Sequence, residues 1–373
     1  MLLSIGWTPR WFLRLWLFVI LQSGPGAAFG LSVVFINPGK STEPYWMLAT
    51  EMMQHAAASL DIELEVLTTE RDYLAQIHFI ETLAQRPAHE RPDYLIVAAE
   101  KTTLLGQLEA AGRAGIPVFL AFNAVTGVDE RVGVPRQYHP HWLGSLAPIA
   151  EEGGYLAARA LIERAIDTLP ADTPLGMVAL AGDRSTHTSR QRNKGLARAL
   201  AEFPQVRLHQ QVHADWSYDK ALEQSTHLLQ RYPDLQLIWS ASDLQAFGAL
   251  QALHEVGRAP GRDVFVSAIN ATQAALESML SGELSALAGG HHMAGAWSLV
   301  LLHDYHHGLD FVDAQGNAEL QYSMFALIDQ RSAKYLLERR RANRSMDFCR
   351  YSRVCNPARE EYDFSYQRWL EVQ

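Results

Sequence analysis

Aromatic and acidic side chains follow the first apolar stretch of the chain, and their chemistry suits contact with a small polar molecule. The stretch reads Leu-Ser-Val-Val-Phe-Ile at residues 31–36, and Glu43, Tyr45 and Trp46 come shortly after it. Aromatic rings stack on the C–H faces of sugars and equally on flat heterocycles, while a carboxylate accepts hydrogen bonds. These residues therefore indicate a binding site, and the alternative is that Tyr45 and Trp46 only cover the core.

Two arginines have the chemistry for a second part of such a site. Arg190 and Arg192 follow an apolar stretch at 176–181 and stand at the start of a helical pattern. A guanidinium presents five donors in one plane, which suits bidentate contact with ring oxygens, hydroxyls or a carboxylate. The position after a strand end favours ligand binding by Arg190, and the alternative is that Arg190 and Arg192 are both surface charges on a first helical turn.

Metal, cofactor and catalytic chemistry have little support in the sequence. His139 and His141 lie in a Pro-rich segment without a third ligand at suitable spacing, and His303 and His307 stand four residues apart without a His-Glu-x-x-His motif. We expect both pairs to be solvated, with no metal bound. No nucleotide-binding glycine motif follows a strand, and no nucleophile–base constellation is apparent, so we expect neither a cofactor nor an enzyme.

The elements that position these residues alternate between strands and helices, which predicts a parallel, doubly wound α/β sheet. A second series of the same kind begins at 176–181, so we expect two such lobes. We expect residues 124–146 to form a loop leading to the first crossing between them. The first series has strands at 31–36, 62–67, 94–98 and 116–122 and helices at 45–59, 73–83 and 104–113, the last of which ends at Gly115.

The composition fits an ordinary folded protein with a sizeable core. The chain has 373 residues, of which 48% are hydrophobic and 20% are charged. The formal net charge of −9 argues against a nucleic-acid partner, because proteins that bind nucleic acids are more often basic.

The two ends of the chain predict export to an oxidising compartment. Residues 1–28 combine Arg10 and Arg14 with a short apolar run and small residues at 26–28, which is typical of a cleaved secretory signal; an uncleaved membrane anchor is the alternative. Cys349 and Cys355 are the two cysteines, and we expect them to form a disulfide. Two free thiols are the alternative.

Residues 31–330 resemble the ribose-type periplasmic solute-binding proteins, which share the type I fold with the ligand domains of LacI-type repressors. The resemblance rests on the opening strand with Pro44-Tyr45-Trp46, on Ala-Gly-Ile-Pro-Val at 114–118 and on Arg-x-Arg-x-x-Gly at 190–195. It implies two doubly wound parallel-sheet lobes joined by three hinge crossings. We expect the N-terminal lobe at 31–143 plus 291–327 and the C-terminal lobe at 144–290 plus 328–373.

The resemblance also implies which residues contact the ligand. Arg190 corresponds to the family arginine that points into the cleft, and Trp216 corresponds to a family aromatic residue in the C-terminal lobe. His291 occupies the region where family members have a glutamine that contacts the ligand. Asp243 is expected to cap the helix after it, leaving Ser242 to the ligand. The complete predicted set is Glu43, Tyr45, Trp46, Phe122, Asn123, Arg190, Trp216, Ser242, Asn270 and His291.

By the same resemblance, the expected function is periplasmic binding of a small polar ligand, a sugar or related solute, for a membrane ABC permease. The alternative output is a signal to a membrane sensor kinase or diguanylate-type receptor. Phe122, Asn123 and Asn270 replace residues that ribose binders use, which shifts the expected ligand away from ribose. The segment 346–373 extends past the usual family ending, and we expect it to pack on the C-terminal lobe.

Overall fold

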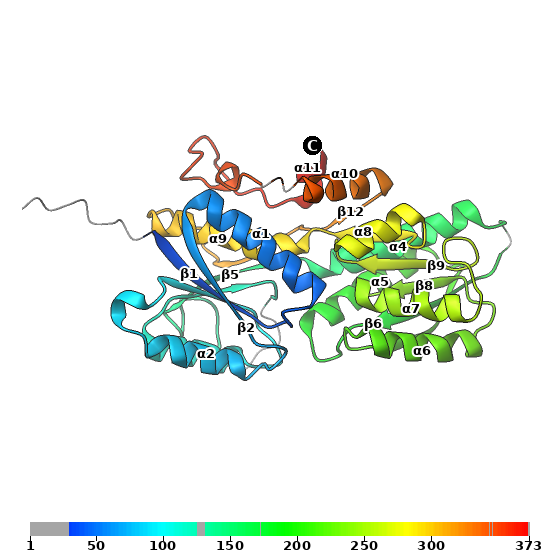
Figure 1. The fold of residues 1–373 in the computed structure, drawn as a ribbon, viewed down its shortest axis with the longest axis horizontal. Helices are drawn as coiled ribbons and strands as arrows, with labels where there is room; N and C mark the ends of the chain where they lie inside the picture. Colours follow the sequence, from blue (N-terminus) through cyan, green and yellow to red (C-terminus); the bar gives the residue numbers. More distant parts are fainter. Residues whose placement is uncertain (1–29, 125–130, 172, 343, 345, 372–373) are drawn as a thin grey trace, which may run out of the picture. The chain divides into compact units, whose positions relative to one another are not determined.

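The computed structural model describes residues 30–124, 131–171, 173–342, 344 and 346–371. The predicted signal, residues 1–28, lies outside this part of the chain. Two six-stranded sheets with helices on both faces make up the described residues (Figure 1). The predicted fold class, with two doubly wound lobes and three crossings, is confirmed.

The N-terminal lobe contains a wholly parallel sheet in the order β11-β5-β4-β3-β1-β2. Helices α1 and α9 pack together on one face, and α2 and α3 on the other. The strands are buried apolar runs, as expected where helices cover both faces. Their bounds are β1 Leu31–Asn37, β2 Ile62–Thr68, β3 Tyr94–Val97, β4 Val118–Ala121, β5 Trp142–Pro148 and β11 Glu319–Tyr322, with helices α1 Pro44–Leu60, α2 Ala75–Ala84, η1 Ala88–Glu90, α3 Leu104–Ala114, η2 His291–Met293 and α9 Ala294–His306.

The C-terminal lobe has the sheet order β12-β10-β9-β8-β6-β7, in which only β12 is antiparallel to its neighbour among the described strands. Helices α4 and α5 pack together on one face, and α6 and α7 on the other. The bounds are β6 Leu175–Ala181, β7 Val206–His213, β8 Leu237–Ser240, β9 Phe265–Ile269, β10 Ala286–Gly289 and β12 Ala326–Leu327, with helices α4 Ala150–Thr168, α5 His187–Glu202, α6 Tyr218–Arg231, α7 Asp243–Glu255 and α8 Gln273–Ser281.

The chain crosses between the sheets three times, after β5, after β10 and after β11. The predicted lobe boundary at 143 is too early, because β5 pairs with β4 and β11 and so belongs to the N-terminal sheet as far as Pro148. For the same reason the predicted loop at 124–146 ends at β5. Gly115 ends α3 as expected, with a φ of 67° that suits a residue without a Cβ.

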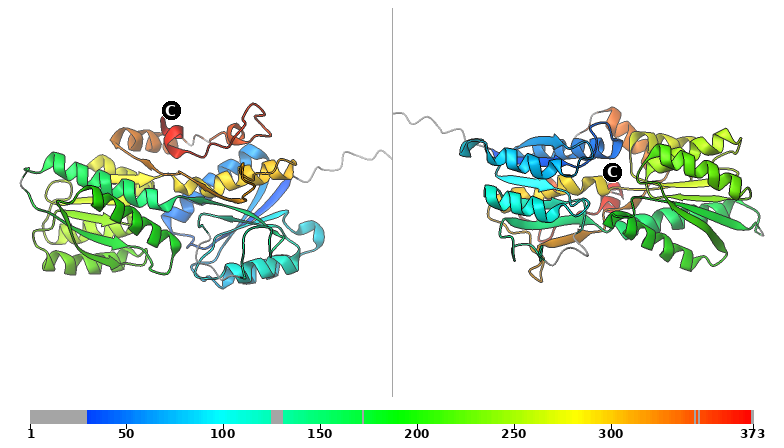
Figure 2. Two further views of the ribbon diagram at one scale, coloured as in Figure 1. Left: turned by 180° about the vertical axis from the view of Figure 1, so that it is seen from behind. Right: turned by 90° about the horizontal axis from the view of Figure 1, so that it is seen from below.

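The C-terminal segment packs on both lobes, whereas the prediction placed it on the C-terminal lobe alone. The ring of Trp369 packs beside Tyr335 of the C-terminal lobe as predicted, with centroids 6.4 Å apart, but other parts of the segment lie on the N-terminal lobe. After α10 (Gln330–Arg341), which packs on α8, the chain returns over α1 and α9 of the N-terminal lobe (Figures 1 and 2). There Ser59 Oγ accepts a hydrogen bond from the Phe348 amide at 2.8 Å, and buried Asp304 accepts one from the Tyr362 hydroxyl at 2.9 Å. The segment also holds η3 (Cys349–Tyr351), α11 (Tyr366–Glu371) and the predicted Cys349–Cys355 disulfide.

Among the helices that the structure describes, none combines the length and the apolar character that a membrane span requires.

Candidate functional site

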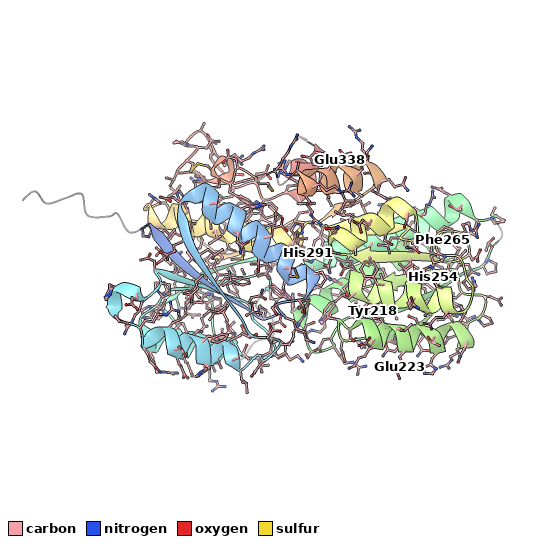
Figure 3. All side chains as sticks on the ribbon, in the orientation of Figure 1. Tyr218, Glu223, His254, Phe265, His291 and Glu338 are labelled. Atoms are coloured by element: carbon pink, nitrogen blue, oxygen red, sulfur yellow. A yellow bond between two sulfur atoms is a disulfide. The ribbon has the colours of Figure 1, made fainter. Side chains whose placement is uncertain are left out.

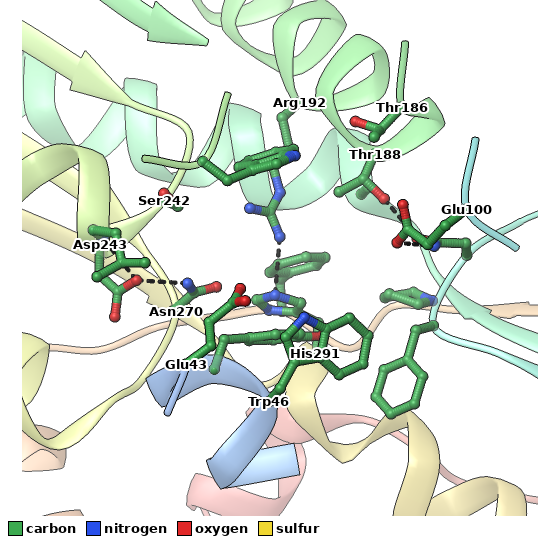
Figure 4. A pocket seen from close by; sticks show the side chains of 18 of the residues that line it. Glu43, Trp46, Glu100, Thr186, Thr188, Arg192, Ser242, Asp243, Asn270 and His291 are labelled. Atoms are coloured by element: carbon green, nitrogen blue, oxygen red, sulfur yellow. Dashed lines mark hydrogen bonds between the residues drawn. The ribbon is translucent and has the colours of Figure 1, made fainter. Parts of the chain in front are cut away.

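A cavity of about 730 Å³, counted with the space at its mouth, opens between the lobes at the carboxyl ends of their strands. Both lobes contribute side chains, and most of these are polar or aromatic (Figure 4). The lining residues are Glu43, Tyr45, Trp46, Arg71, Glu100, Phe122, Asn123, Pro148, Ala150, Thr186, Thr188, Arg192, Trp216, Ser242, Asp243, Leu244, Asn270, His291 and Phe325.

One wall of the cavity is aromatic. Trp46 lies in the first turn of α1, where its ring meets Phe122 edge-on with centroids 5.1 Å apart. The imidazole of His291 stacks between Tyr45 and Phe325, at centroid distances of 5.0 and 4.6 Å. His291 follows the second crossing and so lies where the two lobes approach each other (Figure 3). This wall provides the flat apolar faces on which a ring-shaped ligand stacks.

Trp216 forms the aromatic surface of the C-terminal lobe. Its six-membered ring lies over Gly182, where an added Cβ would come within 2.2 Å of the ring. The absence of a side chain at Gly182 therefore lets the indole lie against the end of β6. The guanidinium carbon of Arg192 is 5.5 Å from the centroid of the Trp216 ring, so the cation and the aromatic face form one surface.

Four lining residues have a backbone conformation that L-amino acids rarely adopt. The φ angles are 68° at Arg71, 72° at Phe122, 61° at Trp216 and 119° at Asn270. Such conformations cost on the order of 1–3 kcal/mol each and persist where the surrounding structure enforces them, often at functional sites. Their concentration in one cavity supports its assignment as the binding site.

Arg192 is the buried cation of the cavity, with only 4% of its surface exposed. One terminal nitrogen donates to the Ala241 carbonyl, and Nη2 lies 2.9 Å from Nε2 of His291. No carboxylate among the described residues forms an ion pair with it, and burial lowers the pKa of Arg192 to about 10. A ligand with oxygen acceptors would therefore compensate part of the cost of burying this charge.

The prediction that Arg190 points into the cleft is wrong. Its side chain is exposed and donates to the Ser185 carbonyl at 2.8 Å. Because α5 begins at His187 with Thr186 as its N-cap, positions 190 and 192 differ by about 200° around the helix. Arg192 shares the inward face with Leu196 and Ala199, and this spacing in the sequence is the signal that would have selected it.

The acidic residues of the cavity are compensated within the protein. Glu43 pairs with Arg71, and the Asn123 amide donates to Glu100 at 3.0 Å. Burial raises the pKa of the Glu100 carboxyl, an effect that the hydrogen bond from Asn123 partly offsets. Asp243 accepts from Asn270 at 2.7 Å and from Thr272, yet burial still raises its pKa.

Ser242 and Asp243 exchange their expected roles in part. Ser242 is the N-cap of α7, where its hydroxyl accepts from the Gln245 amide, so the prediction that Asp243 is the cap is wrong. Asp243 instead orients Asn270 and Thr272 at the end of β9. Both Ser242 and Asp243 line the cavity.

Two contacts join the lobes at the rim of the cavity. The Thr188 hydroxyl donates to Asn123 Oδ1 at 2.9 Å, and Lys101 Nζ lies 3.1 Å from Asp183. In each pair one residue belongs to each lobe, so both contacts require the lobes to be closed on one another.

The structure brings nine of the ten predicted residues into the cavity, and Arg190 is the exception. Sequence reasoning missed the other ten lining residues, which are Arg71, Glu100, Pro148, Ala150, Thr186, Thr188, Arg192, Asp243, Leu244 and Phe325. Apart from Arg192, these residues carry no local pattern that separates them from surface or core residues, because their partners are distant in the sequence.

The histidine pairs lie outside this cavity. His139 Nε2 contacts the Arg131 carbonyl at 3.2 Å, and His307 Nδ1 contacts the His303 carbonyl at 2.8 Å. Within the described ranges, no three His, Cys, Asp or Glu side chains come together as a metal-binding group.

Known proteins resemble this chain along most of its length. A family model described as a periplasmic binding protein domain matches residues 33–308. A D-apiose import binding protein of Actinobacillus succinogenes is 25% identical over 252 residues, which are 67% of this chain and 73% of the relative. A ribose import binding protein of Bacillus subtilis is 23% identical over 258 residues, which are 69% and 74%.

A solved structure is more similar still. The crystal structure of a periplasmic sugar-binding protein from Pseudomonas fluorescens is 35% identical and superposes with a TM-score of 0.81. The match covers 92% of this chain and 100% of that one, so it extends over both lobes. The relatives named here are binding proteins by their descriptions.

Proposed function

The chain belongs to the periplasmic binding protein family, and we propose that it binds a small neutral sugar in the cavity between its lobes for delivery to an ABC importer. Closure of the two lobes around the ligand gives a membrane permease one defined surface to recognise. The protein acts in this proposal as a carrier, without catalysis and without a cofactor.

The observation that carries the proposal is the position of Arg192 between two aromatic surfaces. Its guanidinium lies near the faces of Trp216 and Phe325, at 5.5 and 6.0 Å from their centroids, and contacts His291. A sugar offers ring and hydroxyl oxygens at its edge and C–H groups on its faces. One cation beside flat apolar surfaces matches both features.

The balance of charge supports a neutral ligand over an anionic one. The cavity holds two arginines, Arg71 and Arg192, against three acids, Glu43, Glu100 and Asp243. Arg71 is already paired with Glu43, and the carboxylate raises the pKa of Arg71 despite the opposing effect of burial. An anionic ligand would meet the remaining acids without enough cations to offset them.

Relatives described as apiose and ribose import binding proteins support a small sugar as the ligand, and the similar Pseudomonas fluorescens protein is described as sugar-binding. The apolar, arginine-flanked residues 1–28 support export through a cleaved signal to the periplasm.

A screen of the purified protein by thermal denaturation tests the ligand class. Pentoses, hexoses and polyols are each added in excess, and the midpoint of unfolding is compared with that of the free protein. At least one neutral sugar should raise the midpoint in a saturable way. If only charged solutes, or no solutes, raise it, the proposed ligand class is wrong.

Uptake by cells tests the importer. Accumulation of the labelled sugar found in the screen should fall when the gene is deleted and return when it is restored. Uptake that is unchanged by the deletion would contradict delivery to an importer, even where binding by the purified protein is established.

A further inference from the structure

A second cavity lies along α1, further from its N-terminus than the proposed sugar site. It is bounded by α1, by the segment after the second crossing and by the C-terminal helices α10 and α11. Its volume is about 480 Å³ including its opening, and it shares no lining residue with the first cavity. The proposed carrier function assigns no role to it.

The polar lining of this cavity is mostly basic. Among the described residues that line it are Arg339, Arg340 and Arg344, against one acidic residue, Glu51. Arg340 is largely buried and donates through Nη2 to the Ala271 carbonyl at 2.6 Å, and Arg339 lies with its guanidinium carbon 5.6 Å from the Trp369 ring centroid. These contacts hold both guanidinium groups in place at the cavity wall.

Two histidines add unpartnered nitrogen atoms to the same wall. His292 is only 3% exposed, and its Nδ1 has no hydrogen-bond partner among the described residues. The buried Nδ1 of His55, on α1, likewise lacks one in the described part of the chain. A buried polar atom without a partner destabilises the fold, and a bound ligand would supply the missing hydrogen bond.

We propose that the second cavity binds a small oxyanion, for which inorganic phosphate is the simplest example. A planar guanidinium matches the spacing of two oxygens in a phosphate or carboxylate, and several arginines beside one acid leave excess positive charge. The imidazole nitrogens supply further contacts at the buried end. The apolar side chains Leu48, Met52 and Leu336 around them exclude water and strengthen these interactions.

The site lies where it would contact both lobes. His55 and Glu51 belong to α1 of the N-terminal lobe, whereas α10 packs on α8 of the C-terminal lobe. Arg340 bonds to the carbonyl of Ala271, the residue after Asn270 in the first cavity. An oxyanion held by α1 and α10 together would therefore stabilise the folded arrangement of this hinge region.

The test measures the unfolding midpoint and calorimetric binding of the purified protein with inorganic phosphate, at constant ionic strength kept with chloride. Phosphate should raise the midpoint in a saturable, one-site manner, with sulfate and acetate as further probes of the oxyanion class. Arg339→Gln should weaken phosphate binding about tenfold or more, because a charge-assisted hydrogen bond is lost.

Arg341→Gln is the matched control, since Arg341 is exposed on the same helix, does not line the cavity and carries the same charge. It should keep the phosphate affinity within twofold. If Arg339→Gln does not fold, Arg344→Gln removes an exposed cation of the same cavity and takes its place.

Three results would overturn the proposal. The absence of a saturable effect of phosphate on the parent protein would show that the cavity does not bind this oxyanion. Equal weakening in Arg339→Gln and Arg341→Gln would indicate unspecific attraction. Binding that survives Arg339→Gln but is lost in Arg192→Gln would place the anion in the first cavity.

Discussion

Nη2 of Arg192 lies 2.9 Å from Nε2 of His291, and this contact joins the two lobes inside the cavity. Because a guanidinium only donates, Nε2 of His291 must accept, and the imidazole is neutral with its proton on Nδ1. Burial and the charge of Arg192 hold the pKa of His291 well below its ordinary value, which agrees with this assignment. The pair thus fixes the direction in which Arg192 offers its remaining donors.

Replacing Arg192 by Gln should weaken sugar binding by at least about a hundredfold, since two charge-assisted hydrogen bonds to the ligand are lost at about 1.5–3 kcal/mol each. Titration calorimetry with the sugar from the screen measures the effect. Arg190→Gln removes an equal charge from the exposed side of the same helix and should change the affinity by less than twofold. Similar losses in both variants would contradict the assignment of Arg192.

The lobes and most of the cavity could be predicted because their signals are local. A buried apolar run followed by Tyr45 and Trp46, or by Asn270, shows in the sequence where a strand ends, and parallel strands end at one edge of a sheet. The sequence could not decide whether Arg190 or Arg192 points into the cavity, because that depends on the residue at which α5 begins. Residues two positions apart in a helix lie on nearly opposite faces of it.

Long-range contacts account for what the sequence did not predict. Arg71 becomes a cavity residue because it pairs with Glu43, which lies on another element. Part of the C-terminal segment packs on the N-terminal lobe through Ser59 and Asp304. No local sequence pattern identifies these two residues as its partners. Close packing of α4 on α5 needs Gly154, whose added Cβ would come within 2.1 Å of the Arg192 carbonyl oxygen.

Removing the rim contacts should favour the open form of the free protein. The Lys101–Asp183 pair is partly exposed and contributes about 1 kcal/mol or less, and the Thr188–Asn123 hydrogen bond contributes a similar amount. The double variant Lys101→Ala, Thr188→Val should therefore show a larger radius of gyration by small-angle scattering without sugar, and a sugar affinity several-fold lower.

The control for these contacts is Lys334→Ala, which breaks a pair with Glu338 inside α10 and leaves the rim intact. It should leave the radius of gyration unchanged. If the rim variant and the control scatter alike, the two contacts do not set the position of the lobes.

Acidification should destabilise the protein through His291 and His292. Burial, with a smaller effect from Arg340, lowers the pKa of His292 to about 3, and His291 is lowered in the same direction. The unfolded chain binds protons at these histidines below about pH 6.5, whereas the folded chain does not, so stability falls as the pH drops from about 6.5 towards 3. Between pH 7 and 5 the loss should be about 2 kcal/mol for His292, and His291 should add a loss in the same direction.

Urea denaturation at a series of pH values, in buffers free of phosphate, measures this loss. His292→Gln should remove about 2 kcal/mol of the loss between pH 7 and 5, and the exposed His89→Gln should retain the parental profile. A parental profile in His292→Gln would show that this histidine takes up a proton in the folded state.

Opening the disulfide should loosen the C-terminal segment without affecting the sugar site. The bridge from Cys349 to Cys355 closes a short loop, for which the chain-entropy model gives about 2 kcal/mol of stabilisation. Neither cysteine lines the first cavity, so Cys349→Ser with Cys355→Ser should lower the free energy of unfolding by about this amount and keep the sugar affinity within twofold. Asp304→Asn, which weakens the same packing through the hydrogen bonds from Ser352 and Tyr362, should likewise make the segment more susceptible to limited proteolysis. A large loss of sugar affinity in the cysteine variant, with the fold intact, would mean that the segment takes part in positioning α1 at the cavity.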